Sequence, residues 1–86
     1  MLKATFSPEY ETFLAMLKQS RHDQSLSQVE LAERLGVHQS VVSKSERGER
    51  RMDVLELRDW CLAVRTPFPE FVAALDGKLK RSRKRR

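Results

Sequence analysis

The sequence predicts an all-α fold of five consecutive helices that is followed by a basic C-terminal arm. Two helix starts carry a complete capping box, Ser27 with Glu30 and Asp53 with Glu56, in which each residue can satisfy a backbone N–H of the other. Apolar residues recur at three- and four-residue spacing, which is the period of helices that lie against a core. No internal repeat or Gly/Ser-rich linker divides the 86 residues, so we expect one small domain.

The first helix is expected to begin after Ser7, because serine can cap a helix and Pro8 suits the first helical position. Its apolar stripe consists of Tyr10, Phe13, Leu14 and Leu17. The helix should end near Arg21 or His22, in a polar loop.

Residues 28–46 predict two short helices joined by a tight turn. Gly36 should end the first of them, because glycine takes a left-handed backbone angle without steric cost. At about 100° per residue, the second helix has two faces. Its inward face consists of Val41, Val42 and Ser45, and its outward face of Gln39, Ser40, Ser43, Lys44 and Arg47. This layout is typical of a DNA-reading helix-turn-helix.

The fourth helix should start at the Asp53 capping box and bury a stripe formed by Leu57, Trp60, Cys61 and Val64. A break at residues 66–69 precedes a last short helix, which we expect from about Pro69 to Leu75, closed by Asp76 and Gly77. The folded domain would then span residues 1–77, and residues 78–86 would form a disordered tail.

The net charge of +5 comes from this tail. It carries seven of the 17 lysines and arginines, so residues 1–77 hold ten basic and 12 acidic side chains. The seven are Lys78, Lys80, Arg81, Arg83, Lys84, Arg85 and Arg86. Such an arm is either a disordered, solubilising end or a segment that binds a polyanion, because every phosphate that it neutralises releases counterions.

Several classes of protein are not indicated. The chain has no apolar run of about 18 residues and no apolar signal region near its start, so we expect a cytoplasmic protein without a membrane segment. The single cysteine, Cys61, excludes an intramolecular disulfide and a CxxC or zinc pattern, and His22 has no partner at ligand spacing. The sequence has no nucleophile elbow, HExxH motif or phosphate-binding glycine loop, so we do not expect an enzyme. No metal and no cofactor are expected either.

A resemblance sharpens these expectations. The spacing of Gln28, Ala32, Gly36 and Val42, followed by Glu46, Arg47 and Gly48, resembles the Cro/repressor-type (Xre-like) bacterial and phage regulators over about half of the chain. It implies a lambda-repressor-like fold in which the residues that contact bases are Gln39, Ser40, Ser43 and Lys44. It also implies that Gln28 grips a phosphate and braces the first residue of the reading helix.

Other positions near the helix-turn-helix fit the resemblance less closely. His38 stands where these regulators have a Ser or Thr cap, and we expect it to be a substitute cap or a phosphate neighbour. Ser45 stands where a large side chain is usual, Arg65 where glycine often ends the fourth helix, and Met52 where proline is common. Arg47, Arg50 and Arg51 are placed to hold phosphates; the alternative is that they form a solvated charge cluster with Glu46 and Glu49.

The expected function is therefore sequence-specific binding of double-stranded DNA by a transcriptional regulator, a repressor, that reads the major groove with residues 38–46. The alternative is a protein-interaction module, such as a coactivator or the antitoxin of a toxin pair, whose protein partner is unknown. An RNA-binding arm on a scaffold is a third interpretation, but no aromatic residue follows Phe71 to stack on unpaired bases.

We also expect a homodimer, because a single reading helix contacts few base pairs and paired half-sites add specificity. The candidate interface consists of Leu55, Leu62, Phe68, Phe71 and Leu75. These residues could equally pack the fourth helix against the fifth.

Overall fold

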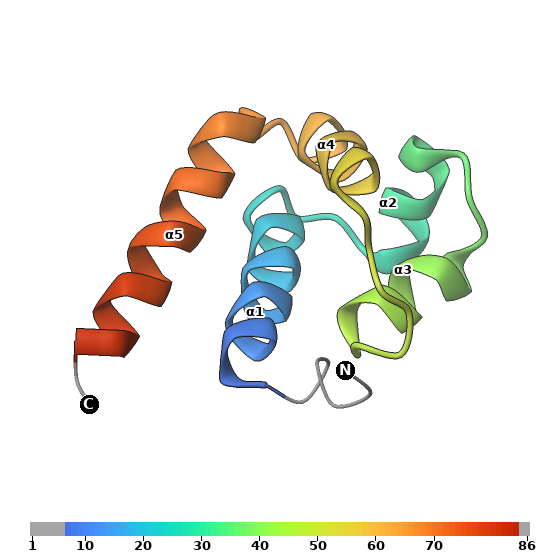
Figure 1. Cartoon of the computed structure of the whole chain (residues 1–86). Helices are drawn as coiled ribbons and strands as arrows, with labels where there is room; N and C mark the ends of the chain where they lie inside the picture. Colours follow the sequence, from blue (N-terminus) through green and yellow to red (C-terminus); the bar gives the residue numbers. More distant parts are fainter. Residues whose placement is uncertain (1–6, 85–86) are drawn as a thin grey trace.

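The computed structural model describes residues 7–84, with side chains up to residue 82, and this part of the chain is all-α. Its helices are α1 (Pro8–Asp23), α2 (Gln28–Leu35), α3 (Gln39–Glu46), α4 (Val54–Ala63) and α5 (Phe68–Lys84). Helix α1 lies in the middle, with α5 on one side and α3 on the other (Figure 1). Helix α2 packs against both α3 and α4, and α4 reaches α5. The predicted five-helix fold is confirmed.

The helices begin where capping residues predict. The Ser7 Oγ accepts the N–H of Tyr10 at 3.1 Å, and both predicted capping boxes are formed. Gly36 ends α2 with a φ of 71°, in the left-handed region that glycine adopts without strain. Local sequence signals therefore fix the starts of these helices and the turn that leads into α3.

Helix α4 is followed by a non-glycine residue in the left-handed conformation, which is sterically unfavourable. Arg65 follows α4 with a φ of 58°, a conformation in which the Cβ of a non-glycine residue approaches the following carbonyl. The N–H of Thr66 bonds to the carbonyl of Cys61 at 2.9 Å across this turn. Arg65 thus performs the role of a C-terminal glycine in a left-handed turn.

The core lies where the helices meet. Its fully buried side chains include Leu17 of α1, Leu31 of α2, Val42 of α3 and Trp60 of α4, and Phe71 of α5 closes it. The Trp60 Nε1 donates to the Ser20 Oγ at 3.0 Å, which satisfies its buried polar atom.

Cys61 belongs to this core and is fully buried, as its place on the apolar stripe predicts. Burial raises the pKa of its thiol to about 11, because the thiolate is poorly solvated there. The side chain is therefore a small apolar packing group rather than a nucleophile.

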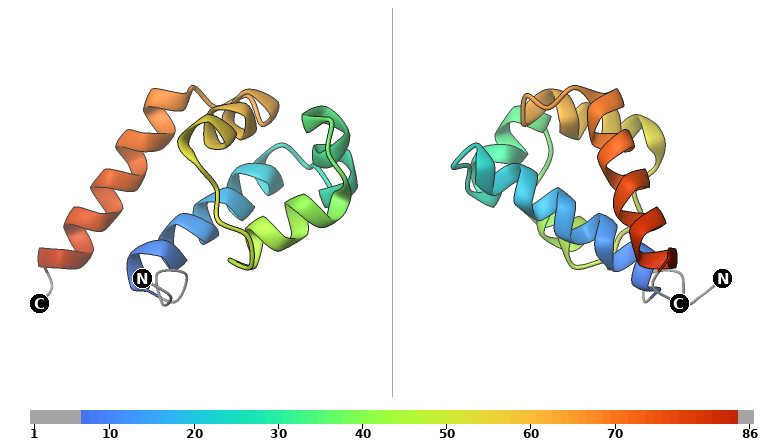
Figure 2. Two further views of the ribbon diagram at one scale, coloured as in Figure 1. Left: turned by 45° about the vertical axis from the view of Figure 1, so that its right-hand side comes forward. Right: turned by 90° about the vertical axis from the view of Figure 1, so that its left-hand side faces the viewer.

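The expected end of the last helix at Asp76 and Gly77 is wrong, and so is the expected disorder of residues 78–84. Helix α5 continues without interruption to Lys84 alongside α1, and its end lies about level with the start of α1 (Figure 2). A glycine inside a helix costs only about 1 kcal/mol, and good helix formers follow it. The Lys80 Nζ also lies 3.2 Å from the Asp76 carboxylate, at the favourable i,i+4 spacing. Arg85 and Arg86 lie outside the described residues.

Among the helices of residues 7–84, none combines the length and the apolar character that crossing a membrane requires.

The capping box of α2 gives a pH-dependent contribution to stability. The backbone N–H of Ser27 donates to the Glu30 carboxylate at 2.8 Å, and this bond, followed by the Ser27 hydroxyl, holds the pKa of Glu30 below its ordinary value. A carboxylate with a lowered pKa stabilises the fold at neutral pH, and this stabilisation is lost as the pH falls through that pKa.

We therefore expect wild type to lose more thermal stability than Glu30→Gln between about pH 7 and about pH 3. The amide oxygen of glutamine still accepts the Ser27 N–H but does not titrate. Melting curves followed by circular dichroism at both pH values measure the difference. Equal losses in the two proteins would contradict this role of Glu30.

Candidate nucleic-acid interface

Helix α3 has one anchored face and one open face. Val42 and Ser45 are buried, at 0% and 2% exposure, and Val41 is half-buried beside them. On the other side, Lys44 and Arg47 are exposed. The remaining polar residues of this face, Gln39, Ser40 and Ser43, are half-exposed. The two faces that the sequence predicts are therefore present, and the polar face is accessible.

The start of α3 is capped by a histidine. The Nδ1 of His38 accepts the backbone N–H of Ser40 at 3.1 Å, and it lies 2.9 Å from the Ser40 hydroxyl. An imidazole nitrogen with a free lone pair thus performs the task of the usual serine or threonine oxygen. The prediction that His38 is a substitute cap is confirmed, while a phosphate contact stays a prediction.

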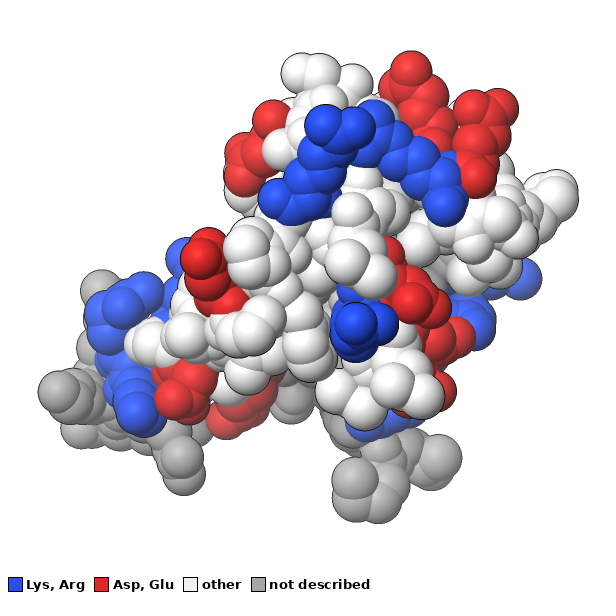
Figure 3. Space-filling model, turned by 90° about the horizontal axis from the view of Figure 1, so that it is seen from above, with Lys and Arg blue, Asp and Glu red and all other residues white. Residues whose placement is uncertain are grey.

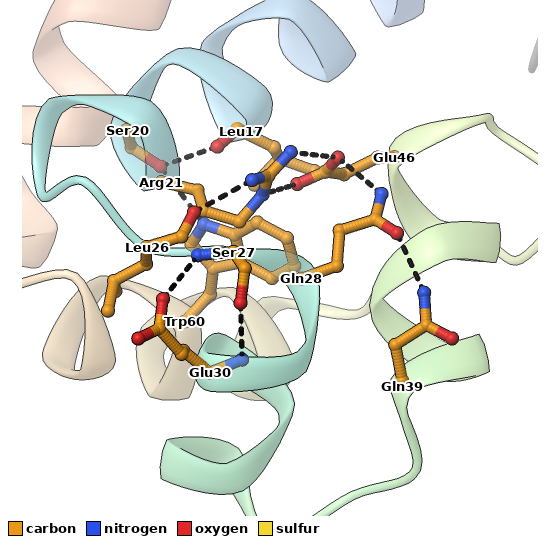
Figure 4. A network of polar contacts seen from close by, with 10 residues as sticks. All are labelled: Leu17, Ser20, Arg21, Leu26, Ser27, Gln28, Glu30, Gln39, Glu46 and Trp60. Carbon is orange, nitrogen blue, oxygen red and sulfur yellow. Dashed lines mark hydrogen bonds and ion pairs between the residues drawn. The ribbon is translucent and has the colours of Figure 1, made fainter.

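Two glutamines connect α2 to the first residue of α3. The Nε2 of Gln39 donates to the Oε1 of Gln28 at 2.8 Å, and the Nε2 of Gln28 donates to the Oε1 of Glu46 at 3.1 Å (Figure 4). The brace that the resemblance implies for Gln28 is therefore present. It leaves one N–H and the oxygen of the Gln39 amide for other partners.

Glu46 also anchors the far end of α3 through a buried ion pair. Its carboxylate accepts two hydrogen bonds from Arg21, at 2.6 Å from Nε and 3.0 Å from Nη2, and the two residues are only 5% and 7% exposed. The Nη1 of Arg21 donates to the carbonyl of Leu26 at 2.8 Å, which ties the loop before α2 into the same network. Bidentate geometry of this kind is the strongest form of such a pair.

This pair is not evident from the sequence. The expectation that Arg21 lies in a polar loop is wrong, and so is the alternative that Glu46 belongs to a solvated charge cluster. The two residues are separated by 25 positions, so no local pattern connects them. The available signal was the charge of Glu46 next to the inward-facing Ser45, and it did not identify a partner.

The flanking arginines are held by groups of the protein itself. Arg47 bonds to Glu49 at 2.9 Å and also to the Ser43 hydroxyl, and Arg50 pairs with Glu56. These hydrogen bonds lower the pKa of Glu49 and of Glu56. Because solvent reaches both pairs, each contributes little to stability, and each arginine can exchange its carboxylate for another anion.

Two further arrangements concern the basic residues. The guanidinium of Arg51 lies 5.4 Å from the ring centre of Tyr10, at cation–π distance, and its side chain is exposed. From above, basic side chains gather over the last described turns of α5, whereas the rest of that face carries both signs (Figure 3).

Within residues 7–84, His, Cys, Asp and Glu form no group that could hold a metal ion.

The candidate dimer residues fall into two groups. Leu55 and Leu62 are 69% and 63% exposed on α4, as an interface requires. Phe71 is only 4% exposed and belongs to the core, so its assignment to an outer patch is wrong. Phe68 also packs against the core, and Leu75 is half-buried on α5. The ring of Phe71 lies edge-on to that of Phe13 in α1, with 6.3 Å between the centroids, and the two leucines of α4 stay exposed.

Comparison with known proteins agrees with this geometry. Residues 17–71 match the sequence model of a helix-turn-helix family. An XRE-family like protein from Pseudomonas syringae pv. tomato str. DC3000 is 38% identical, with a TM-score of 0.78 over 81% of this chain and 85% of that one. The clp gene regulator ClgR from Corynebacterium glutamicum shares the fold, with 23% identity and a TM-score of 0.74 over 92% of this chain and 84% of that one. No curated protein matches.

The buried ion pair should dominate the electrostatic contribution to stability. Glu46→Ala leaves the Arg21 guanidinium buried without its counter-charge, which costs about 3–5 kcal/mol of unfolding free energy. The matched control is Glu49→Ala, which breaks the exposed pair with Arg47 and should change the unfolding free energy far less. Urea denaturation measures both, and similar small losses for the two variants would refute the structural role of Glu46.

Proposed function

The chain belongs to the XRE-type helix-turn-helix family, and we propose that it is a sequence-specific transcriptional regulator that reads the major groove of duplex DNA with α3. The observation that carries this proposal is the accessible polar face of an eight-residue helix whose opposite face is buried. Membership of this family of DNA-binding domains also agrees with the expectation that the chain is not an enzyme.

The open face of α3 offers the chemistry that base recognition needs. Gln39 keeps a donor and an acceptor that can address one base edge, and Lys44 can donate to the acceptor atoms of guanine. The short hydroxyls of Ser40 and Ser43 allow the backbone to approach the bases and can serve several of them. We assign base contacts to these four residues.

Phosphate contacts would surround this face. Gln28 is the first residue of α2, where free N–H groups favour an anion, and His38 caps α3 beside it. Arg47, Arg50 and Arg51 follow α3. The surface ion pairs of Arg47 and Arg50 are weak enough to exchange for phosphate oxygens, and the Arg51 side chain is exposed. The basic residues of α5 and of the last positions add affinity that does not depend on sequence.

Regulation would follow from occupancy. A domain bound in the major groove excludes other proteins from the same site, so we assign it the role of repressor. We place it in the cytoplasm of a bacterium, where the DNA lies. Recognition of two half-sites about 34 Å apart would require a homodimer, and the exposed Leu55 and Leu62 offer an apolar surface for it.

Base reading and phosphate binding can be separated by mutation. Lys44→Ala should change the preference at a single base position by about 1–3 kcal/mol. Lys80→Ala should instead weaken binding to all sequences alike and reduce the salt dependence by about one counterion. Fluorescence anisotropy with sites selected from a random DNA pool measures both effects. If both variants weaken binding to all sequences alike, the result would argue against reading of the major groove by α3.

The proposed dimer has its own test. Sedimentation with a selected site should give a complex that contains two chains, and Leu62→Glu should reduce it to one because a charge cannot be buried in an apolar interface without a partner. Glu33→Gln, on the exposed surface of α2, is the control. A 10.0 kDa species without DNA, together with a complex that contains one chain per site, would remove the proposal.

A further inference from the structure

We infer that Glu49 forms an autoinhibitory contact: its carboxylate occupies the guanidinium of Arg47 in the free protein, competes there with DNA phosphate and lowers the affinity for every duplex. This inference rests on the proposed function, since it concerns an arginine that is assigned to phosphate binding. Two observations carry it, the turn that fixes Glu49 beside Arg47 and the hydrogen bonds between the two side chains.

The turn after α3 brings Glu49 back beside the helix. The N–H of Glu49 donates to the carbonyl of Lys44 at 2.9 Å, and the N–H of Gly48 donates to the carbonyl of Ser45 at 3.2 Å. Gly48 has a φ of 78°, which is the left-handed conformation that this pair of bonds requires. The backbone of Glu49 is therefore fixed to the last turn of α3, and its carboxylate stays near Arg47 even when the two are not bonded.

Glu49 and Ser43 together occupy the guanidinium of Arg47. The Nε and Nη2 of Arg47 donate to the two carboxylate oxygens of Glu49, at 2.9 and 3.2 Å, and Nη1 donates to the Ser43 hydroxyl. The hydrogen bonds from Arg47 also lower the pKa of Glu49, so its carboxylate is charged at neutral pH. Arginine grips a phosphate with the same kind of two-donor edge. A phosphate that takes this edge of Arg47 must therefore displace Glu49.

The displaced carboxylate continues to oppose the DNA. Because the turn fixes the backbone of Glu49, its freed charge stays within a Debye length, about 8 Å, of the phosphate that replaced it. Two negative charges at this separation repel each other, and the attraction between Glu49 and Arg47 has also been lost. Arg47 therefore adds less affinity than an unpaired arginine would, and the base contacts of α3 supply a larger share of the total.

The two arginines that follow provide an internal comparison. Arg50 pairs with Glu56, whose other oxygen accepts the N–H of Asp53 at 2.9 Å and is thereby fixed to the start of α4. Arg51 has no carboxylate partner in the described part of the chain. We therefore expect Arg51→Met to weaken duplex binding more than Arg47→Met does.

The test is Glu49→Gln, which keeps the shape of the side chain and one acceptor for Arg47 but removes the charge. We expect its affinity for a selected site and for a scrambled duplex to rise alike, by about three- to tenfold, because phosphate contacts read no sequence. Fluorescence anisotropy at about 0.1 M salt measures both affinities. At higher salt the gain should shrink, because screening weakens the competing charge.

Glu70→Gln is the matched control for the change in net charge. Glu70 lies in the first turn of α5, across α1 from α3 (Figure 1), and it forms no ion pair within the described part of the chain. Because this charge is distant from the proposed interface, its removal should raise the affinity by under about twofold.

A double-mutant cycle separates competition from simple repulsion. If Glu49 only repelled the DNA, Glu49→Gln would give the same gain whether or not Arg47 is present. If Glu49 competes for Arg47, the gain should fall to under about twofold in the Arg47→Met background, because no guanidinium is left to release. Circular dichroism confirms that the variants are folded.

The outcomes separate the inference from the proposed function. Equal gains in the two backgrounds, or equal effects of Glu49→Gln and Glu70→Gln, overturn the autoinhibitory contact and leave base reading by α3 intact. A wild-type protein that binds the selected and the scrambled duplex equally well overturns base reading, while the same titrations of Glu49→Gln still decide whether Glu49 competes with phosphate.

Discussion

The position of α3 depends on the buried ion pair between Arg21 and Glu46. This pair joins the end of α1 to the end of α3, and its third hydrogen bond, to the carbonyl of Leu26, holds the loop that leads into α2. A helix of eight residues is too short to be stable in water on its own. Its orientation must come from tertiary contacts, and this pair supplies a directional one beside the apolar contact of Val42.

The same arrangement reconciles stability with an accessible binding surface. Buried Val42 and Ser45 face the core, so the polar side chains on the outer face of α3 need not contribute to packing. The cap from His38 satisfies a backbone N–H at one end of the helix, and the ion pair of Glu46 fixes the other. The face proposed to read DNA can therefore carry short and polar residues without loss of the fold.

Helix α5 extends the domain in a way that matters for charge. Its first turns supply Phe71 to the core, while its later turns carry lysines and arginines on a helix rather than on a flexible tail. Basic groups on a rigid element have a defined position relative to α1, so their contribution to phosphate binding is geometric as well as electrostatic. Leu55 and Leu62 stay exposed on the outer surface of α4, while Phe68 and Phe71 of α5 pack with the core.

The sequence by itself determined the helix starts, the turn at Gly36 and the two faces of α3, because capping, a left-handed glycine and helical periodicity are local properties. The resemblance added the brace between Gln28 and Gln39. Only the tertiary structure decided that Arg21 meets Glu46, that Phe71 is buried rather than on an outer patch, and that α5 continues past Gly77. These features arise from contacts between residues far apart in the chain or from weak propensities that packing overrides, and no local pattern encodes them.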